Sequence, residues 1–506
     1  MTQPNILFIM ADQMSADALP FHGHRVVRTP ALSRLAAEGV VFENVYCNSP
    51  LCGPSRLSMM SGRLPAAIGA YDNAVEFAAS TPTFAHYLRR LGYVTCLSGK
   101  MHFVGPDQLH GYEERLTTDI YPSDFGWTPN WGEPDAKVQF QDMQNVLEAG
   151  PCARSMQLDY DEEAAYQAVR WIYDRARSDD ERPFMLTVSF TQPHDPYVAL
   201  PEFWDLYDPA EIDLPAVPAI PSDQKDAHSR RLHEHYSVGE AEVTDDIIRR
   251  TRHGYYASIS YIDSKVAELV AALERSGLAE NTIVIFASDH GDMMGERGMY
   301  YKKCFFEWSV HVPLIFHAPD RFAPRRVSQV VSLVDMLATF VELGGGKGKD
   351  ILATDGASIV GLAMGEETAP RIIAAEYLAE GVFEPAFMLR DDKWKFLYSE
   401  IDPPVLFDMI ADPLELSNLA ANPEHAGTVE GFSRIAREMW NAAELKARIV
   451  EDQDRRRLVH RAHMTGRAPA WDYQPFTDAS QQFVRAGKWT VEVEAKAHLD
   501  SPSRKP

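Results

Sequence analysis

The chain has 506 residues, of which 45% are hydrophobic and 24% are charged, as in a globular protein with one large and one smaller domain. Its formal net charge of −24 would repel nucleic acid and anionic membranes, so we expect neither as a partner. No stretch approaches the roughly 20 apolar residues that cross a bilayer. The run 6–10 is too short for a signal peptide, so we expect a cytoplasmic protein.

The first part of the chain alternates short apolar runs with amphipathic helical patterns. Between the runs lie patterns such as 30–39 and 256–278, whose apolar residues recur at helical spacing. The alternation predicts a layered α/β domain with ligand-binding residues directly after the strands. The runs that are apolar on both faces, typical of strands buried in a parallel sheet, are 5–10, 93–97, 184–190 and 282–286.

After about residue 370 the pattern changes to short strand-like pieces separated by turn signals, which predicts a small antiparallel sheet. A helix should follow from about 430 to 455, and then a polar tail. We expect the tail aromatics Trp471 and Tyr473 to pack against another surface, such as a neighbouring subunit. We therefore divide the chain into an α/β domain, an α+β subdomain, and a helix with a tail, at 1–365, 366–440 and 441–506.

Polar side chains follow two of the predicted strands. Asp12 and Gln13 come after the first run, and Asp289 and His290 follow the run 282–286. Either aspartate alone could simply cap the next helix or turn. Together, carboxylates, an amide and one imidazole form an oxygen-rich set that suits Ca²⁺, Mg²⁺ or Mn²⁺. The sequence therefore predicts a metal site.

Cys52 lies in a Pro-bounded segment just ahead of an apolar-periodic stretch at 57–62. We expect it at or just before a helix N-terminus, where free amides and the helix dipole favour an anion. The chain has five cysteines, which is poor material for a disulfide framework. An arbitrary cysteine of this kind is usually a small buried hydrophobe.

The pattern Cys-x-Pro-x-Arg at Cys52, Pro54 and Arg56 resembles the signature of type I sulfatases of the alkaline phosphatase superfamily, whose cysteine is converted to formylglycine. The resemblance continues from the first strand to about residue 420. Segments similar to family motifs are 5–13, 98–102 (Ser-Gly-Lys-Met-His), 191–196, 288–292, Lys302 and 406–420.

This resemblance implies an alkaline-phosphatase-like sandwich with a large, mostly parallel central sheet flanked by helices, a small C-terminal antiparallel-sheet subdomain and an extended tail. It implies hydrolysis of sulfate esters through a formylglycine hydrate at position 52. The implied cofactor is one divalent cation, Ca²⁺ first, with Mn²⁺ or Mg²⁺ as alternatives. The implied metal ligands are Asp12, Gln13, Cys52, Asp289 and His290, and the implied catalytic residues are Cys52, Arg56, Lys100, His102, His194 and Lys302.

Two positions depart from the common family pattern: Gln13 stands where many members have a second acid, and His290 stands where an Asn is frequent. The implied basic residues would surround the sulfate oxygens and stabilise their negative charge. They would supply locally the positive charge that the whole chain lacks. The histidines are the expected proton donors to the departing alkoxide, with His194 the first choice and His102 the second.

Longer stretches are similar to bacterial choline sulfatases in particular, namely 99–111, 113–122, 124–129, 193–198 and 203–207. Trp127 could hold a quaternary ammonium by cation–π attraction, although core packing of such a Trp is about equally frequent. Asn73 is the second expected substrate contact. The branch's expected histidine is missing from 130–156, and the best acid in 486–496 is Glu492. An arylsulfatase, or a phosphonate or phosphate ester hydrolase of the same superfamily, therefore stays open.

The expected partners are a small sulfate ester, a formylglycine-generating enzyme for maturation, and further copies of the chain in a homodimer or homotetramer. A non-catalytic sulfate-binding protein with an unmodified Cys52 is a further alternative. The intact motif beside a full set of ligands argues against it.

Overall fold

The computed structural model describes residues 3–133, 141–366, 369–482, 485 and 489–491. Its centre is an eight-stranded sheet in the order β10-β2-β9-β8-β1-β6-β3-β4. Strand β9 runs antiparallel to both of its neighbours, and the other strand pairs in this sheet are parallel. The strands are β1 (Asn5–Ala11), β2 (Val40–Tyr46), β3 (Val94–Gly99), β4 (Glu114–Arg115), β6 (Phe184–Ser189), β8 (Thr282–Ser288), β9 (Leu314–His317) and β10 (Arg325–Ser332).

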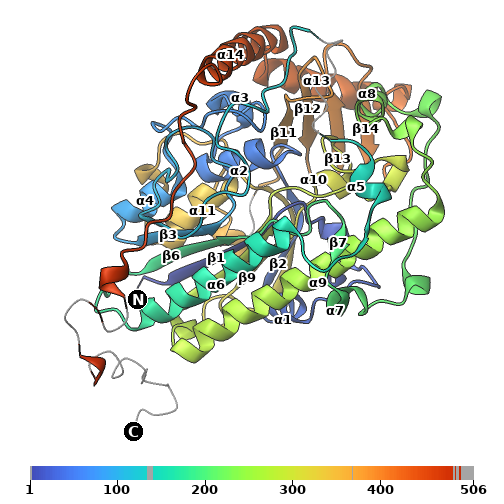
Figure 1. The fold of residues 1–506 in the computed structure, drawn as a ribbon. Coiled ribbons are helices and arrows are strands. Elements are labelled where there is room, and N and C mark those ends of the chain that lie inside the picture. Colours follow the sequence, from blue (N-terminus) through green and yellow to red (C-terminus); the bar gives the residue numbers. More distant parts are fainter. Residues whose placement is uncertain (1–2, 134–140, 367–368, 483–484, 486–488, 492–506) are drawn as a thin grey trace.

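Helices cover both faces of this sheet (Figure 1). Strand β1 shows why its sequence is apolar throughout: Ile6, Phe8 and Met10 pack into one hydrophobic core, and the alternate residues pack into the other. One core includes α2 (Cys52–Ser61), α3 (Pro65–Ile68), α4 (Phe84–Arg90), α11 (Asp335–Leu343) and α12 (Val360–Met364). The other includes α1 (Pro30–Glu38), α5 (Gln144–Leu147), α6 (Met156–Ala176), α7 (Pro201–Trp204), α8 (Ala227–His235) and α9 (Asp245–Ser276).

Shorter elements connect these layers. Strands β5 (Gly150–Pro151) and β7 (Val198–Ala199) form a small parallel pair, and α10 (Glu307–Val310) lies between β8 and β9 in the chain. The 3₁₀ helices are Ala16–Ala18, Pro20–His22, Pro209–Glu211, Ser222–Gln224, Val238–Glu240, Ala279–Asn281, Glu296–Gly298, Gly348–Asp350, Pro423–His425 and Ala479–Gln481.

The C-terminal part forms a separate four-stranded antiparallel sheet in the order β11-β12-β13-β14. Its strands are β11 (Ile373–Tyr377), β12 (Ala386–Arg390), β13 (Trp394–Tyr398) and β14 (Val405–Asp408), and α13 (Ala426–Met439) packs on it. The predicted fold class is thereby confirmed: a large, mostly parallel sheet with helices on both faces, and a small antiparallel sheet.

The single helix predicted at 430–455 is in fact two helices, α13 and α14 (Ala442–His463). The break lies at Trp440, whose backbone is extended. Its ring stacks on Phe387 and its indole N–H donates to Glu376. Asn441 then caps the new helix by accepting the backbone N–H of Glu444 at 3.2 Å.

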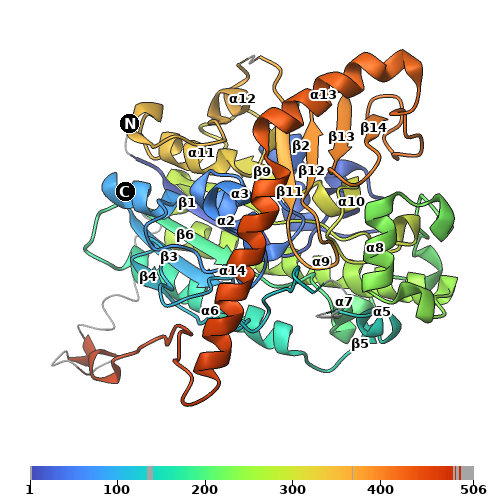
Figure 2. The same ribbon diagram turned by 90° about the horizontal axis from the view of Figure 1, so that it is seen from above.

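Helix α14 runs back across the α/β domain, over α2 and α3 (Figure 2). The tail beyond it packs on the same chain: Trp471 lies edge-on to Phe125, and Tyr473 lies under the guanidinium of Arg115. The expected packing of the tail aromatics is thus found within the chain, and contact with another subunit stays a prediction. Among the described residues, no helix is long and apolar enough to span a membrane.

Candidate active site

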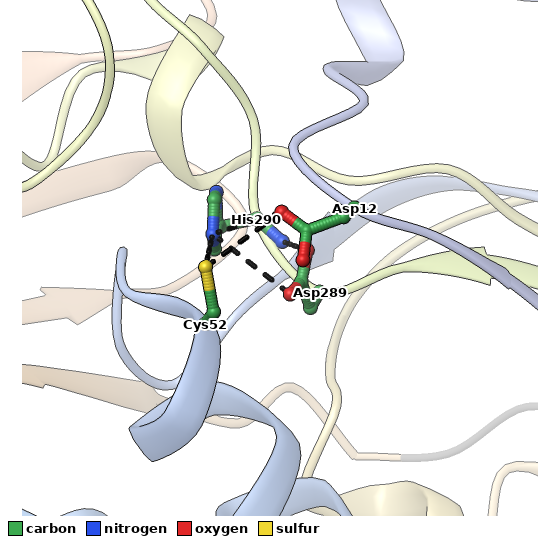
Figure 3. Close-up of side chains that lie close together, drawn as sticks. All are labelled: Asp12, Cys52, Asp289 and His290. Atoms are coloured by element: carbon green, nitrogen blue, oxygen red, sulfur yellow. Dashed lines mark hydrogen bonds and ion pairs between the residues drawn. The ribbon is translucent and has the colours of Figure 1, made fainter. Parts of the chain in front are cut away.

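The predicted metal ligands meet at the carboxyl ends of two neighbouring strands. Strands β1 and β8 pair in parallel with Ala11 opposite Ser288, so Asp12 and Asp289 leave the sheet side by side. Nε2 of His290 lies 3.8 Å from Oδ1 of Asp12 and 3.8 Å from Oδ2 of Asp289. Figure 3 shows four residues whose ligand atoms all lie within 4.8 Å of one another: Asp12, Cys52, Asp289 and His290.

Helix α2 begins at Cys52 because Leu51 before it is extended. Pro54 is tolerated there, since amides in the first turn have no partner within the helix. Gly62, with a φ of 66°, ends the helix in the left-handed conformation that glycine favours. The predicted position is therefore found: Cys52 lies at a helix N-terminus, where the helix dipole favours negative charge.

The Cys52 side chain is fully buried and faces the other three residues. Its Sγ lies 3.2 Å from Nε2 of His290 and 3.7 Å from Oδ1 of Asp12. Burial opposes ionisation of the thiol, but the charges of Lys100, Lys302 and His290 outweigh it and hold the pKa of Cys52 well below its usual range. The surroundings therefore stabilise an anion at this position.

Arg56 connects the two aspartates from beneath the site. It is fully buried, and it donates to Oδ2 of Asp289 at 2.7 Å and to Oδ2 of Asp12 at 3.0 Å. Its remaining nitrogen donates to the Lys100 carbonyl at 2.6 Å and to Oγ of Ser189 at 2.8 Å. These contacts favour a role in holding the carboxylates, and a direct contact of Arg56 with sulfate stays a prediction.

Lys100 forms an ion pair with Asp12, and both side chains are fully buried. Burial and the nearby Cys52 raise the pKa of Asp12, but Lys100 and Arg56 outweigh them and hold it well below its usual range. Asp12 is therefore ionised at neutral pH, as a ligand of a hard cation must be.

Lys302 lies beside His194 and Gln13 on another side of the site. Its Nζ is 2.8 Å from Nε2 of His194, and it also donates to Oε1 of Gln13. The amide nitrogen of Gln13 faces Asp292 and, at 3.4 Å, Asp195. An amide oxygen that accepts from an ammonium is poorly placed to bind a cation as well, so the metal role of Gln13 stays a prediction that these contacts do not favour.

His102 packs beside the rings of Tyr121 and Trp127, and its backbone N–H donates to Asp119 at 2.8 Å. Its Nε2 lies 3.0 Å from the backbone carbonyl of Asn73, which can only accept, so Nε2 carries the proton and Nδ1 the lone pair. Nδ1 is buried and has no hydrogen-bond partner among the described residues. Oδ1 of Asn73 accepts the Gly53 N–H at 2.8 Å.

A cavity of about 480 Å³ opens above Cys52. The predicted substrate contacts Asn73 and Trp127 line it, together with Cys52, His194 and Lys302. Sequence reasoning missed other residues of the wall: Tyr121, Gln141, Asp142, Asn145, Asp195 and Glu380.

Two of the missed residues matter most for recognition. Tyr121 packs against Trp127 with ring centroids 5.1 Å apart. It lies in the segment 113–122, which is similar to choline sulfatases, so the sequence could have indicated it. Glu380 lies in the connection after β11 and has no local motif that could have singled it out. Glu492, the acid considered from the sequence, lies outside the described residues.

Comparisons with known proteins agree with this geometry. A family model described as "Sulfatase" matches residues 4–346, and models described as "N-sulphoglucosamine sulphohydrolase, C-terminal" and "Choline sulfatase enzyme C terminal" match 295–441 and 447–497. The choline-sulfatase of Rhizobium meliloti (strain 1021) is 44% identical over 493 residues, which are 96% of each chain. Arylsulfatase K of Gallus gallus is 28% identical over 90% of this chain and 86% of its own.

Solved structures show the same fold at lower identity. The phosphonate monoester hydrolase of Agrobacterium radiobacter superposes with a TM-score of 0.69 at 23% identity, covering 88% of this chain and 96% of that one. A 2-O GAG sulfatase superposes with a TM-score of 0.68 at 21% identity, covering 87% and 92%. Because the sulfatase model spans more than half of the chain and the Rhizobium relative aligns over nearly all of it, this chain belongs to the sulfatase family and is a sulfate ester hydrolase.

Proposed function

We propose that the chain hydrolyses choline-O-sulfate, or a closely similar small alkyl sulfate, with a formylglycine made from Cys52. The observation that carries this proposal is the position of Cys52, at the start of α2 and against Asp12, Asp289 and His290. A buried thiol with two carboxylates, one imidazole and two ammonium groups around it is an arrangement typical of reactive sites.

Asp12, Asp289 and His290 fit one divalent cation. Their donors are two carboxylates and an imidazole, all fully buried, which suits Ca²⁺ or Mg²⁺ and, through the imidazole, Mn²⁺. Such a cation would acidify the attacking hydroxyl and neutralise charge on the sulfate. Arg56 would keep the two carboxylates in place with or without the ion.

The formylglycine hydrate would supply two hydroxyl groups, one to attack the sulfur and one whose loss of a proton later releases sulfate. Lys302 reaches the cavity beside Cys52, and its ammonium can stabilise negative charge on the sulfate oxygens. Lys100, which forms an ion pair with Asp12, adds a second positive charge near Cys52. This concentration of cations binds an anion despite the net charge of the chain.

His194 and His102 make different hydrogen bonds, and we propose different roles for them on that basis. His194 lies in the cavity wall with Nε2 against the Lys302 ammonium, so this pair can deliver a proton to the departing alcohol. Nδ1 of His102 has no hydrogen-bond partner in the described part of the chain, so it could accept a proton from the second hydroxyl as sulfate leaves. We therefore keep His194 as the first choice of proton donor, and we propose His102, the second choice from the sequence, as the base.

Choline is proposed as the alcohol on three grounds. The Rhizobium relative is named a choline-sulfatase, and the model described as "Choline sulfatase enzyme C terminal" covers 447–497. The cavity wall has the aromatic rings of Trp127 and Tyr121 and the carboxylates of Glu380 and Asp142. Aromatic faces and carboxylates are the groups that hold a quaternary ammonium.

We propose three further properties of the protein. A formylglycine-generating enzyme would mature Cys52, the chain would work in the cytoplasm, and it would assemble as a homodimer or homotetramer. An arylsulfatase or phosphorus ester hydrolase activity is the alternative outcome of the assay that follows.

The test compares sulfate release from choline-O-sulfate and from 4-nitrophenyl sulfate, and hydrolysis of a phosphonate monoester, by wild type and Trp127→Ala. The proposal predicts a preference for choline-O-sulfate and a loss of at least tenfold in kcat/KM for that ester alone in the variant. Equal losses on all esters, or a preference of the wild type for the aryl or phosphorus ester, would discard choline.

A further inference from the structure

Helix α14 contacts two loops that line the cavity, through one buried arginine. Arg456 donates to both carboxylate oxygens of Asp72, at 2.9 and 2.7 Å, and to Oγ1 of Thr128 at 3.1 Å. Both of these partners directly precede or follow a cavity residue in the chain: Asp72 precedes Asn73, and Thr128 follows Trp127. Arg456 is 3% exposed and Asp72 is fully buried, so this contact is shielded from water and salt.

A second residue of α14, three residues earlier on the same face of the helix, contacts the loop of Thr128 again and, through it, a third loop. Oε1 of Gln453 accepts the backbone N–H of Trp131 at 2.8 Å. The indole N–H of Trp131 donates to the carbonyl of Ala379 at 2.9 Å, and the next residue is the cavity residue Glu380. Gln453 is 1% exposed.

The sulfate-binding side of the site does not depend on α14 in this way. Asp12 and Asp289 follow β1 and β8, and Arg56 in α2 holds both. The predicted metal ligands are therefore held within the α/β domain, whereas the alcohol-binding wall is held in part by α14. Asn73 connects the two, because its Oδ1 accepts the Gly53 N–H and its carbonyl contacts Nε2 of His102.

We propose that Arg456 and Gln453 are positioning residues, through which the C-terminal helix α14 holds the alcohol-binding wall of the cavity and so sets which ester is accepted. This proposal depends on the proposed function in one respect, namely that choline is the alcohol. Neither residue touches the substrate. They act on Asn73, Trp127 and Glu380 through the loops that carry them.

The decisive variant is the double substitution Asp72→Asn with Arg456→Met. Arg456→Met alone leaves Asp72 as a buried unpaired carboxylate, which destabilises the fold for reasons unrelated to specificity. The double variant removes the buried carboxylate charge of Asp72 together with its hydrogen bonds to Arg456. Gln453→Leu tests the second contact. Arg455→Met is the matched control, because Arg455 is exposed and its ion pair, with Asp452 of the same helix, reaches neither loop; Arg456 pairs with the same Asp452.

Two readouts decide the proposal. In hydrogen–deuterium exchange of the full chain, peptides covering 70–76 and 126–132 should exchange at least tenfold faster in the double variant, while peptides of β1 and β8 stay unchanged. In steady-state assays, kcat/KM for choline-O-sulfate should fall 10- to 100-fold, mainly because KM rises. The fall in kcat/KM for 4-nitrophenyl sulfate should be less than a third of this factor. Gln453→Leu should show a smaller loss with the same substrate ratio, and Arg455→Met should match wild type.

Unchanged exchange of both loops in the folded double variant would overturn the proposal, and so would equal losses on the two esters. If the wild type fails to hydrolyse either ester, the proposed function is wrong. The exchange data would then still decide whether α14 positions these loops.

Discussion

Nζ of Lys302 lies 2.8 Å from Nε2 of His194. Because an ammonium can only donate, Nε2 must accept this hydrogen bond, and the proton of a neutral imidazole lies on Nδ1. Nδ1–H donates to the backbone carbonyl of Asp195 at 2.7 Å. The pair therefore holds one transferable proton next to the cavity, where the alcohol would leave.

This relationship predicts how His194→Ala depends on the leaving group. For an alkyl sulfate, whose alkoxide needs a proton as it departs, kcat should fall by about 10²- to 10⁴-fold. For 4-nitrophenyl sulfate the loss should stay below about tenfold, since nitrophenolate leaves without protonation. Rates over a series of esters with graded leaving-group pKa measure this, and a loss independent of the leaving group would contradict it.

His102→Ala should impair the second half of the reaction. The substitution removes the imidazole that we propose as the base. Release of sulfate from the enzyme should then slow while the first ester cleavage continues. Rapid-quench kinetics should then show a burst of alcohol, and intact mass spectrometry should detect a sulfated chain. A variant that shows no burst and no added mass would assign His102 to the first step instead.

Removal of the divalent cation should abolish activity and lower stability. If the ion binds only the folded chain, a concentration 100 times its Kd contributes about 2.7 kcal/mol. Dialysis against a chelator should therefore lower Tm, and titration with Ca²⁺, Mg²⁺ or Mn²⁺ should restore it with the true cofactor first. Asp289→Asn should not respond to the added metal, and a wild type that keeps its Tm and activity after chelation would contradict the site.

Arg56→Met should be among the most damaging substitutions. It leaves Asp12 and Asp289 without their shared partner in a fully buried site, and breaking a buried pair in this way costs about 3–5 kcal/mol. Arg63→Met is the matched control, because Arg63 pairs with Asp355 at a partly exposed surface and should lose only about 0–1 kcal/mol. Urea denaturation of both variants measures the difference, and similar losses would argue against a special role for Arg56.

His311 predicts a pH dependence of stability. Burial opposes its charge, but Asp17 and Glu307 outweigh this and raise the pKa of His311 to about 8. Both ring nitrogens face acceptors, Asp17 at 3.3 Å and the Glu43 carbonyl at 2.8 Å. Since the folded pKa exceeds the unfolded value, the contribution is complete below pH 6.5 and is lost as pH rises through 8.

A shift from 6.5 to about 8 corresponds to about 2 kcal/mol. Wild type should therefore lose about 2 kcal/mol more unfolding free energy between pH 6 and pH 9 than His311→Gln does. Asp17→Asn should remove part of the same difference. Urea denaturation at the two pH values measures it, and identical pH profiles of wild type and His311→Gln would show that this imidazole is neutral in the fold.

Much of the fold followed from the sequence because burial dictates its pattern. Strands such as β1 and β8 are apolar on both faces since helices cover both, and polar residues directly after them must lie at one edge of the sheet. The break at Trp440 was not predictable, because stacking on Phe387, a residue distant in sequence, determines it.

The site was predictable where a motif is local and not where the fold assembles it. Cys52 and Arg56 lie in one helical turn, so their spacing alone marks them. Glu380 reaches the cavity from the second sheet, and Arg456 reaches Asp72 across 384 positions. No local pattern links such pairs. Whether Gln13 can bind a metal depends on the neighbours of its amide. These are Lys302, Asp195 and Asp292, all distant in sequence.

The most direct test of the central claim is mass spectrometry of the peptide that carries Cys52, from protein produced with a formylglycine-generating enzyme and assayed for sulfate release in the same preparation. We expect the mass loss of thiol-to-aldehyde conversion at Cys52, with sulfate-releasing activity proportional to the converted fraction. An unconverted Cys52 in an active preparation, or full conversion without release of sulfate from any ester, would contradict it.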